Sequence, residues 1–178
     1  GGLFTLSSCT APTNVKDYSA YVNPFIGTGG HGHTFPGAVV PHGMIQPSPD
    51  TRIDGWDACS GYYYADSTIN GFSHTHVSGT GCCDYGDVLL MPTVGKQQYR
   101  TTDPQSQRLA YASSFSHKNE IAEPGYYSVF LDTYQVKAEI SSTKRGAIHR
   151  YTFPENTESG FIIDLDYSLQ RQTNSEME

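Results

Sequence analysis

The span from residue 55 to residue 87 concentrates side chains that are able to bind or react. It reads GWDACSGYYYADSTINGFSHTHVSGTGCCDYGD and holds the chain's only tryptophan together with histidines, cysteines, tyrosines and glycines. No apolar pattern with the period of a strand or a helix runs through it, so packing in a core does not explain its composition. We therefore treat this span as the first candidate for a functional site.

Trp56 stands between Gly55 and Asp57, in a polar setting that is unusual for a core tryptophan. The apolar C–H faces of a sugar ring stack on aromatic rings, while neighbouring acids and amides bind its hydroxyl groups. Gly55, Trp56 and Asp57 therefore predict a sugar subsite. The alternative is a tryptophan buried in the core beneath a loop.

Two histidine pairs, His31 with His33 and His74 with His76, each have one residue between them. On a strand this spacing places both imidazole rings on the same face, which suits a metal ion. No carboxylate stands at a companion spacing beside the first pair. Hydrogen bonds to sugar hydroxyls or to loop backbone are therefore favoured, and we assign no metal ligand in this chain.

Motifs for other chemistries are missing from the sequence. GTGC, residues 79–82, matches neither the G-x-S-x-G elbow nor a cysteine-protease signature, and GTGGHGH lacks the Lys-Ser/Thr end of a phosphate loop. A glycosidase needs two carboxyl groups across one bond, but the sequence does not show which of its aspartates converge. The net charge of -7 and the lack of a basic cluster exclude nucleic acid as a partner.

Residues 1–16 resemble a signal remnant or a lipoprotein tether. LFTLSSC, residues 3–9, is similar to the end of an apolar signal segment with a bacterial lipobox, in which Cys9 becomes the lipidated residue. Residues 10–16 would then be a flexible tether, and the protein would be periplasmic or at the cell surface, with an outer-membrane lipoprotein as one form. The alternative is a disordered N-terminus with an unmodified Cys9.

The other cysteines leave two interpretations open. Cys82 and Cys83 are adjacent and rarely bridge each other, so a disulfide, which an exported protein permits, would join Cys59 to one of them. Free thiols are the equal alternative. Zinc is not predicted because no CxxC pair occurs.

Residues 17–178 predict one all-β domain, an antiparallel β-sandwich. Glycine and proline interrupt residues 17–50 too often for a helix and leave room for short extended pieces at 38–40 and 44–46. Strands at a spacing of roughly ten residues, with turns between them, are typical of a sandwich. They are predicted at residues 88–91, where Pro92 closes the run, and at 126–131, 134–140, 147–153 and 160–165.

One of these segments has the clear pattern of a strand with one wet face. Tyr134, Val136, Ala138 and Ile140 alternate with polar residues. The helix-like candidate at residues 118–122 is stopped by a Pro-Gly pair. Because the sequence ends soon after GFIIDLDYSL, we expect the sandwich to lack its last strands.

Four strings, in the same order along the chain, resemble the N-terminal region of glycoside hydrolase family 92. They are YVNPFIGTGGHGHTFPGAVVPHGMIQPSPDT (residues 21–51), GWDACSGYYYADSTINGFSHTHVSGTGCCDYGDVLLMPTVG (residues 55–95), EPGYYSVFL and RGAIHRYTFP. The match covers most of residues 20–166. Members of this family are calcium-dependent, exo-acting α-mannosidases that invert the anomeric centre, and gut Bacteroidetes frequently export them to consume mannose-rich N-glycans.

The resemblance implies a two-domain enzyme that hydrolyses terminal α-mannosides of N-glycans or mannans. Its N-terminal β-sandwich packs on a C-terminal (α/α)6 barrel, which chiefly supplies the catalytic acid, the catalytic base and the calcium site. A chain of 178 residues does not include that barrel. The resemblance therefore places no catalytic residue here and implies that this chain is inactive alone, with α-mannoside glycans, calcium and the (α/α)6 domain as its partners.

The family's GWDxCSGY string and the FSHTH string indicate which residues reach, line or brace the pocket of the terminal mannose. These residues are Gly55, Trp56, Asp57, Cys59, His74 and His76. The sequence departs from the family pattern at Tyr63, where a histidine is frequent, and at Cys83, where a small residue is frequent. Two other functions stay open: a stand-alone carbohydrate-binding or surface-adhesion sandwich without catalysis, and a structural sandwich whose loops only pack.

Overall fold

Two antiparallel sheets form the frame of the computed structural model, which describes residues 16–99, 108–155 and 157–169. The first sheet has the strand order β1-β3-β4-β9, and the second has the order β2-β5-β6-β7-β8. The elements of the first sheet are β1 (Ser48–Asp50), β3 (Gly71–Ser73), β4 (Leu89–Val94) and β9 (Ser159–Asp164). Those of the second are β2 (Thr68–Ile69), β5 (Ser113–Glu123), β6 (Tyr126–Leu131), β7 (Val136–Ser142) and β8 (Ala147–Thr152).

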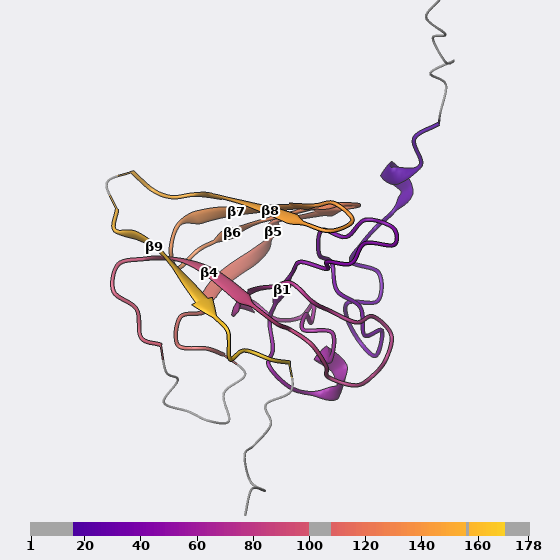
Figure 1. The fold of residues 1–178 in the computed structure, drawn as a ribbon, viewed down its shortest axis with the longest axis horizontal. Coiled ribbons are helices and arrows are strands. Elements are labelled where there is room, and N and C mark those ends of the chain that lie inside the picture. Colours follow the sequence, from indigo (N-terminus) through magenta and orange to yellow (C-terminus); the bar gives the residue numbers. More distant parts are fainter. Residues whose placement is uncertain (1–15, 100–107, 156, 170–178) are drawn as a thin grey trace, which may run out of the picture.

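The helical content of the described residues is two short 3-10 turns, η1 (Ser19–Tyr21) and η2 (Trp56–Ala58). Figure 1 shows the second sheet lying over the first, with the indigo and purple loops from the first third of the chain gathered at one side. The predicted antiparallel β-sandwich is therefore confirmed. None of the helices in the described ranges has the length and apolar character needed to span a bilayer.

Successive hairpins build most of the second sheet. Gly125, in the turn between β5 and β6, has a φ of 75°, in the left-handed region that glycine favours. The β7–β8 turn is closed by the Thr143 N–H, which donates to the Gly146 carbonyl at 2.8 Å. The predicted alternation in β7 holds from Val136 to Ala138, which are buried on either side of an exposed residue, but fails at Glu139, which is buried and bonded to Arg150 and Tyr126.

The core lies between the two sheets and continues on the far side of the first. Phe72 of β3 approaches the rings of Tyr127 of β6 and Tyr151 of β8, at 6.4 and 6.3 Å between centroids. Phe72 pairs with Leu90, so the neighbouring Leu89 and Met91 point to the opposite face of β4, where they too are fully buried. Both faces of the first sheet are therefore covered at β3 and β4, whereas Phe161 and Ile163 of β9 remain exposed; burying each covered apolar side chain contributes about 2 kcal/mol.

The helix-like candidate at residues 118–122 is wrong, because these residues belong to strand β5. Glu120, Ile121 and Ala122 pair with Val129, Ser128 and Tyr127 of β6, and the register shifts between Phe115 and Glu120. The tight turn after β5 places the two segments side by side, so cross-strand pairing decides the conformation over local propensity. The register shift accommodates the extra residues that break the alternation.

Several strand boundaries also differ from the prediction. β4 does not stop at Pro92 but continues to Val94. Its pairing with β3 is confined to Leu90, whereas β9 pairs with all of it, so the proline lies where one side of the strand has no ladder to lose. β7 starts after Gln135, which has a left-handed φ of 55° in the preceding turn. The extended pieces expected at 38–40 and 44–46 join neither sheet.

Candidate functional site

Trp56 is presented to solvent by a short turn that is itself anchored in the core. Gly55 precedes η2 with a φ of 112°, and its carbonyl accepts the N–H of Ala58 at 3.1 Å. Ala58 and Cys59 are buried, whereas Trp56 is 57% exposed. The alternative of a core tryptophan is therefore wrong, and the indole is available for contact with another molecule.

The glycine-rich loop that carries the first histidine pair folds onto this tryptophan. The His31 ring lies 4.9 Å from the Trp56 ring, and the His33 ring meets it edge-on at 4.4 Å. His31 Nδ1 lies 2.5 Å from Asp57 Oδ1, and the His31 side chain is 72% exposed. The indole, the His31 imidazole and the Asp57 carboxylate thus share one exposed patch, and the buried His33 ring packs against the indole. We call these four residues the Trp56 patch: His31, His33, Trp56 and Asp57.

The backbone of the histidine loop explains how its rings reach Trp56. A Cβ at Gly32 would lie 2.1 Å from the Gly27 carbonyl oxygen, so the loop closes on itself at a point where only glycine fits. His33 has a φ of 54°, and its carbonyl accepts the N–H of Gly79 at 2.6 Å. The His33 ring is buried, with Nε2 lacking a hydrogen-bond partner in the structure. The close approach at Gly32 and the bond to Gly79 therefore hold the histidine loop in place beside the indole.

Beneath the patch, the segment after η2 is tied to β1 and to the histidine loop. The Thr51 N–H donates to the Gly61 carbonyl at 2.7 Å, and the Tyr63 N–H donates to Thr51 Oγ1 at 2.8 Å. The Tyr64 N–H donates to the Thr28 carbonyl at 2.9 Å. These bonds fix the position of the whole GWDACSGYYY string relative to the first sheet.

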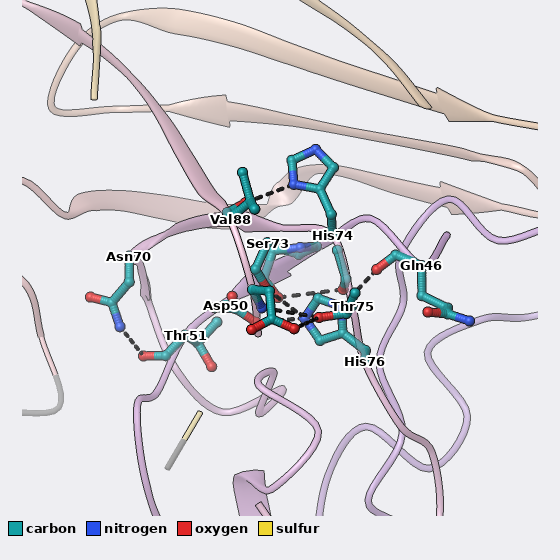
Figure 2. Close-up of polar contacts among 12 residues, drawn as sticks. Gln46, Asp50, Thr51, Asn70, Ser73, His74, Thr75, His76 and Val88 are labelled. Carbon is teal, nitrogen blue, oxygen red and sulfur yellow. Dashed lines mark hydrogen bonds and ion pairs between the residues drawn. The ribbon is translucent and has the colours of Figure 1, made fainter. Parts of the chain in front are cut away.

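His76 lies below the surface and braces this arrangement (Figure 2). Its Nδ1 donates to the Gln46 carbonyl at 2.7 Å, since a carbonyl can only accept, and its Nε2 lies 2.7 Å from Asp50 Oδ1 and 3.1 Å from Ser73 Oγ. The side chains of His76 and Asp50 have no exposed area. The three groups resemble a Ser-His-Asp set in composition only, because serine and aspartate contact the same ring nitrogen and no substrate reaches them.

His74 points the other way from His76, toward the second sheet (Figure 2). Its Nδ1 donates to the Val88 carbonyl at 2.7 Å, and its Nε2 lies 3.0 Å from Nε2 of His149 on β8. His149 Nδ1 in turn lies 2.7 Å from the Tyr151 hydroxyl. Burial, with a smaller effect of His74, lowers the pKa of His149 to about 4. The two histidines of the HTH string therefore do not share a face, because the strand ends at Ser73.

The described cysteines are free thiols around the Trp56 turn. Cys59 is buried, Cys82 is exposed, and Cys83 Sγ lies 3.5 Å from the Gly55 carbonyl oxygen. Burial raises the pKa of the Cys59 and Cys83 thiols above the ordinary value, which makes them poor nucleophiles at neutral pH. Of the two interpretations left open by the sequence, the structure has the free thiols. Cys9 lies outside the described residues.

The family of the chain is decided by comparison with known proteins. A family model, the glycosyl hydrolase family 92 N-terminal domain, matches residues 21–178. This chain belongs to glycoside hydrolase family 92.

Solved family 92 enzymes share its fold. A family 92 α-mannosidase from Bacteroides thetaiotaomicron, also solved in complex with mannoimidazole, is 44% identical with a TM-score of 0.79, over 85% of this chain and 20% of that chain. A family 92 inverting mannosidase from the same species is 32% identical with a TM-score of 0.68, over 84% of this chain and 20% of that chain.

A curated relative extends the comparison beyond bacteria. An uncharacterized secreted glycosidase from Arthroderma benhamiae is 32% identical over 143 residues, which is 79% of this chain and 18% of the relative. This family 92 chain therefore spans about a fifth of the length of the relatives that it matches.

The residues singled out from the sequence fall into three groups in this family 92 domain. Gly55, Trp56 and Asp57 lie at the exposed patch. Cys59 and His76 lie beneath it with buried side chains, so they support the patch and present no surface to a ligand. The third group is His74, which is directed to the second sheet.

The contacts of His31 and His33 with Trp56 are not evident from the sequence. The sequence favours hydrogen bonds of this pair to sugar hydroxyls or to loop backbone over a metal ion, but it does not link the pair to Trp56. The HGH spacing was the available signal, but contact with a tryptophan more than twenty residues away depends on how the glycine loop closes. That closure is visible only in three dimensions.

Proposed function

We propose that this chain is the N-terminal sandwich of an inverting exo-α-mannosidase, and that the Trp56 patch forms one wall of the pocket for the terminal mannose. The observation that carries the proposal is an exposed indole flanked by Asp57 and His31 in a family 92 domain. An indole face suits the apolar side of a pyranose, while the carboxylate and the imidazole offer hydrogen bonds to its hydroxyl groups. A buried position for the indole would have excluded this role.

The catalytic acid and base of the proposed enzyme belong outside this chain. Inversion needs two carboxyl groups about 6.5–9.5 Å apart on opposite sides of the scissile bond. Asp57 is held by His31 and Asp50 is buried against His76, so neither is arranged as one of such a pair. The work of this domain is to bind and orient the sugar, and we propose that the domain alone is inactive.

Calcium, which the family implies, does not fit the described residues. No group of three or more histidine, cysteine, aspartate or glutamate side chains in the described ranges is arranged to hold a metal ion. Asp50 Oδ2 is buried without a hydrogen-bond partner, but it stands beside His76 and lacks the several oxygen ligands that calcium requires. We therefore derive no step through calcium here and propose its ligands elsewhere in the enzyme.

We also propose export of the protein beyond the cytoplasmic membrane. The support is the secreted glycosidase among its relatives and the lipobox-like string that ends in Cys9. Anchoring through a lipid on Cys9 is the form that the sequence favours, and mass spectrometry of the protein isolated from membranes tests it. An unmodified N-terminal segment would contradict the lipid anchor.

The proposed sugar wall is tested in the complete enzyme with the variant Trp56→Ala. We expect kcat/KM on α-1,2-, α-1,3- and α-1,4-linked mannobiosides to fall about tenfold or more, because a lost ring contact of roughly 1.4 kcal/mol corresponds to a factor of ten. Tyr21→Ala is the matched control, since Tyr21 is an exposed aromatic on η1, outside the patch. Unchanged kinetics in Trp56→Ala would leave the patch with a structural role alone.

A binding measurement separates the enzyme from a stand-alone carbohydrate-binding sandwich. Trp56 is the only tryptophan, so its fluorescence reports directly on the patch. We expect α-mannosides to bind this chain more weakly than they bind the complete enzyme, because one wall buries only part of a sugar. Equal affinity in the two proteins would favour the stand-alone binding function.

A further inference from the structure

A buried carboxylate lies under the segment that carries the Trp56 patch. The Glu120 side chain, on β5, has no exposed area. The Tyr62 hydroxyl donates to its two oxygens at 3.0 and 3.1 Å, the Tyr127 hydroxyl donates to it at 2.6 Å, and His117 Nδ1 lies at 2.6 Å. Both carboxylate oxygens are thus occupied by side chains from three different parts of the fold.

This network is costly to bury and specific in its geometry. A carboxylate without partners in an apolar interior is strongly destabilising, so removing any one donor leaves a poorly compensated group. Burial, and next the nearby Glu120, raises the pKa of both Tyr62 and Tyr127 well above the ordinary value. Both hydroxyls therefore keep their protons and remain donors to Glu120.

Tyr62 connects this network to the patch through a short and rigid path. The Cys59 N–H donates to the Trp56 carbonyl at 3.4 Å, and the Gly61 N–H donates to the Ala58 carbonyl at 2.8 Å. The residues from Ala58 to Tyr62 are buried throughout. Two successive hydrogen-bonded turns therefore join Trp56 to Tyr62, whose hydroxyl donates to Glu120.

A second connection leads to the same carboxylate. The Tyr64 ring stacks on the His117 ring with centroids 4.2 Å apart and planes 11° apart. His117 contacts Glu120 in turn. Glu120 is therefore linked to both ends of the YYY string: to Tyr62 by a hydrogen bond, and to Tyr64 through the stacked His117 ring.

We propose that Glu120 is a positioning residue for the sugar wall. Through Tyr62 and the His117–Tyr64 stack it holds the segment that presents Trp56, although it touches no ligand. The consequence for sugar binding rests on the proposed function, whereas the positioning of Trp56 is measurable without any sugar. Loss of the tyrosine link therefore loosens the indole.

The test compares two variants, each of which removes one hydroxyl group that donates a hydrogen bond to the Glu120 carboxylate. Tyr62→Phe cuts the link to the patch, and Tyr127→Phe is the matched control on β6. In Tyr62→Phe we expect the fluorescence anisotropy of Trp56 to fall and its acrylamide quenching constant to rise about twofold, as local order is lost. In Tyr127→Phe both quantities should equal the wild-type values under conditions where the two variants are folded by far-UV circular dichroism.

A second variant keeps the test decisive if Tyr62→Phe does not fold. Tyr64→Leu removes the stack on His117 from a partly exposed site, and we expect the same changes in Trp56 fluorescence. Glu139→Gln is its control, because Glu139 is a hydrogen-bonded carboxylate on β7 held by Arg150 and Tyr126. Equal changes in the variants and their controls, or no change in any of them, would overturn the positioning role and leave Glu120 as a stability element.

Titration with methyl α-mannoside distinguishes the two proposals. If Tyr62→Phe loosens Trp56 and also weakens the response to the sugar, both proposals are supported. If Tyr62→Phe loosens Trp56 but the sugar produces no response in any protein, including the complete enzyme, the sugar wall is contradicted and the positioning role stands.

Discussion

At the scale of single residues, His149 is the clearest case of a side chain whose ionisation is coupled to folding. Its two ring nitrogens face His74 and the Tyr151 hydroxyl, and its folded pKa is about 4 against an ordinary 6.5. Between these values the unfolded chain binds a proton that the folded chain does not. The contribution of His149 to stability is therefore fully present above pH 6.5 and is lost as the pH falls toward 4.

We predict that His149→Gln flattens the pH dependence of stability in this window. The shift corresponds to about 3 kcal/mol of unfolding free energy between pH 6.5 and pH 4 in the wild type. Urea titrations at several pH values measure it, with the exposed His42→Asn as the control that keeps the wild-type slope. A variant as sensitive to acid as the wild type would contradict the assignment to His149.

Glu139 affects the pH dependence of stability in a separate and lower pH range. Its hydrogen bonds with Arg150, and then with Tyr126, lower its pKa to about 2 from an ordinary 4.5. Its contribution is present above pH 4.5 and is lost as the pH falls toward 2. We predict that Glu139→Gln removes part of the acid sensitivity below pH 4.5 and leaves the slope between pH 6.5 and pH 4.5 unchanged, as measured by the same urea titrations.

At the scale of elements, the histidine loop depends on a contact that only glycine permits. A Cβ at Gly32 would lie 2.1 Å from the Gly27 oxygen, whereas a Cβ at Gly29 would make an ordinary contact with Tyr64 at 3.7 Å. We predict that Gly32→Ala lowers the unfolding free energy by about 1–3 kcal/mol, as overpacking does, and that Gly29→Ala changes it by less than about 0.5 kcal/mol.

The fluorescence of Trp56 gives this prediction a second measurement. His31 and His33 contact the indole from the loop that Gly32 closes, so Gly32→Ala should shift the emission maximum to longer wavelength as the indole becomes wetter. Gly29→Ala should leave it in place. If both alanine variants keep the wild-type emission and stability, the close approach at Gly32 does not hold the loop.

The same elements explain which parts of the structure were predictable from the sequence. β6 and β7 follow from a local pattern of alternation and turn residues; β6 has the predicted bounds, whereas β7 overlaps the predicted 134–140 but runs from Val136 to Ser142. β5 was missed because its strand character comes from pairing with β6. Residue types and spacing indicated Gly55, Trp56 and Asp57 of the candidate site. The approach of His31 to Asp57 and the burial of His76 depend on contacts between distant segments, so the sequence alone does not show them.

At the scale of the whole molecule, this chain presents the exposed Trp56 patch, and its described residues contain no group of three or more side chains arranged to hold a metal ion. Its solved relatives are about five times as long, and its exposed indole lies outside the covered core of its own sandwich. The proposed sugar wall needs a second surface to enclose a ligand. The proposed enzyme therefore requires that binding and catalysis be divided between this sandwich and another domain.

This proposed division of binding and catalysis between two domains predicts that calcium binds outside this chain. Because no described group of three metal-binding side chains exists in this chain, we predict that neither calcium nor a chelator changes its Tm, whereas the complete enzyme loses mannosidase activity on chelation and regains it with calcium. A ligand that binds the native state at 100 times its Kd stabilises it by about 2.7 kcal/mol, which differential scanning calorimetry detects easily. Magnesium is the control for nonspecific ionic effects. A calcium-specific rise in the Tm of this chain would place calcium ligands within it and contradict the division.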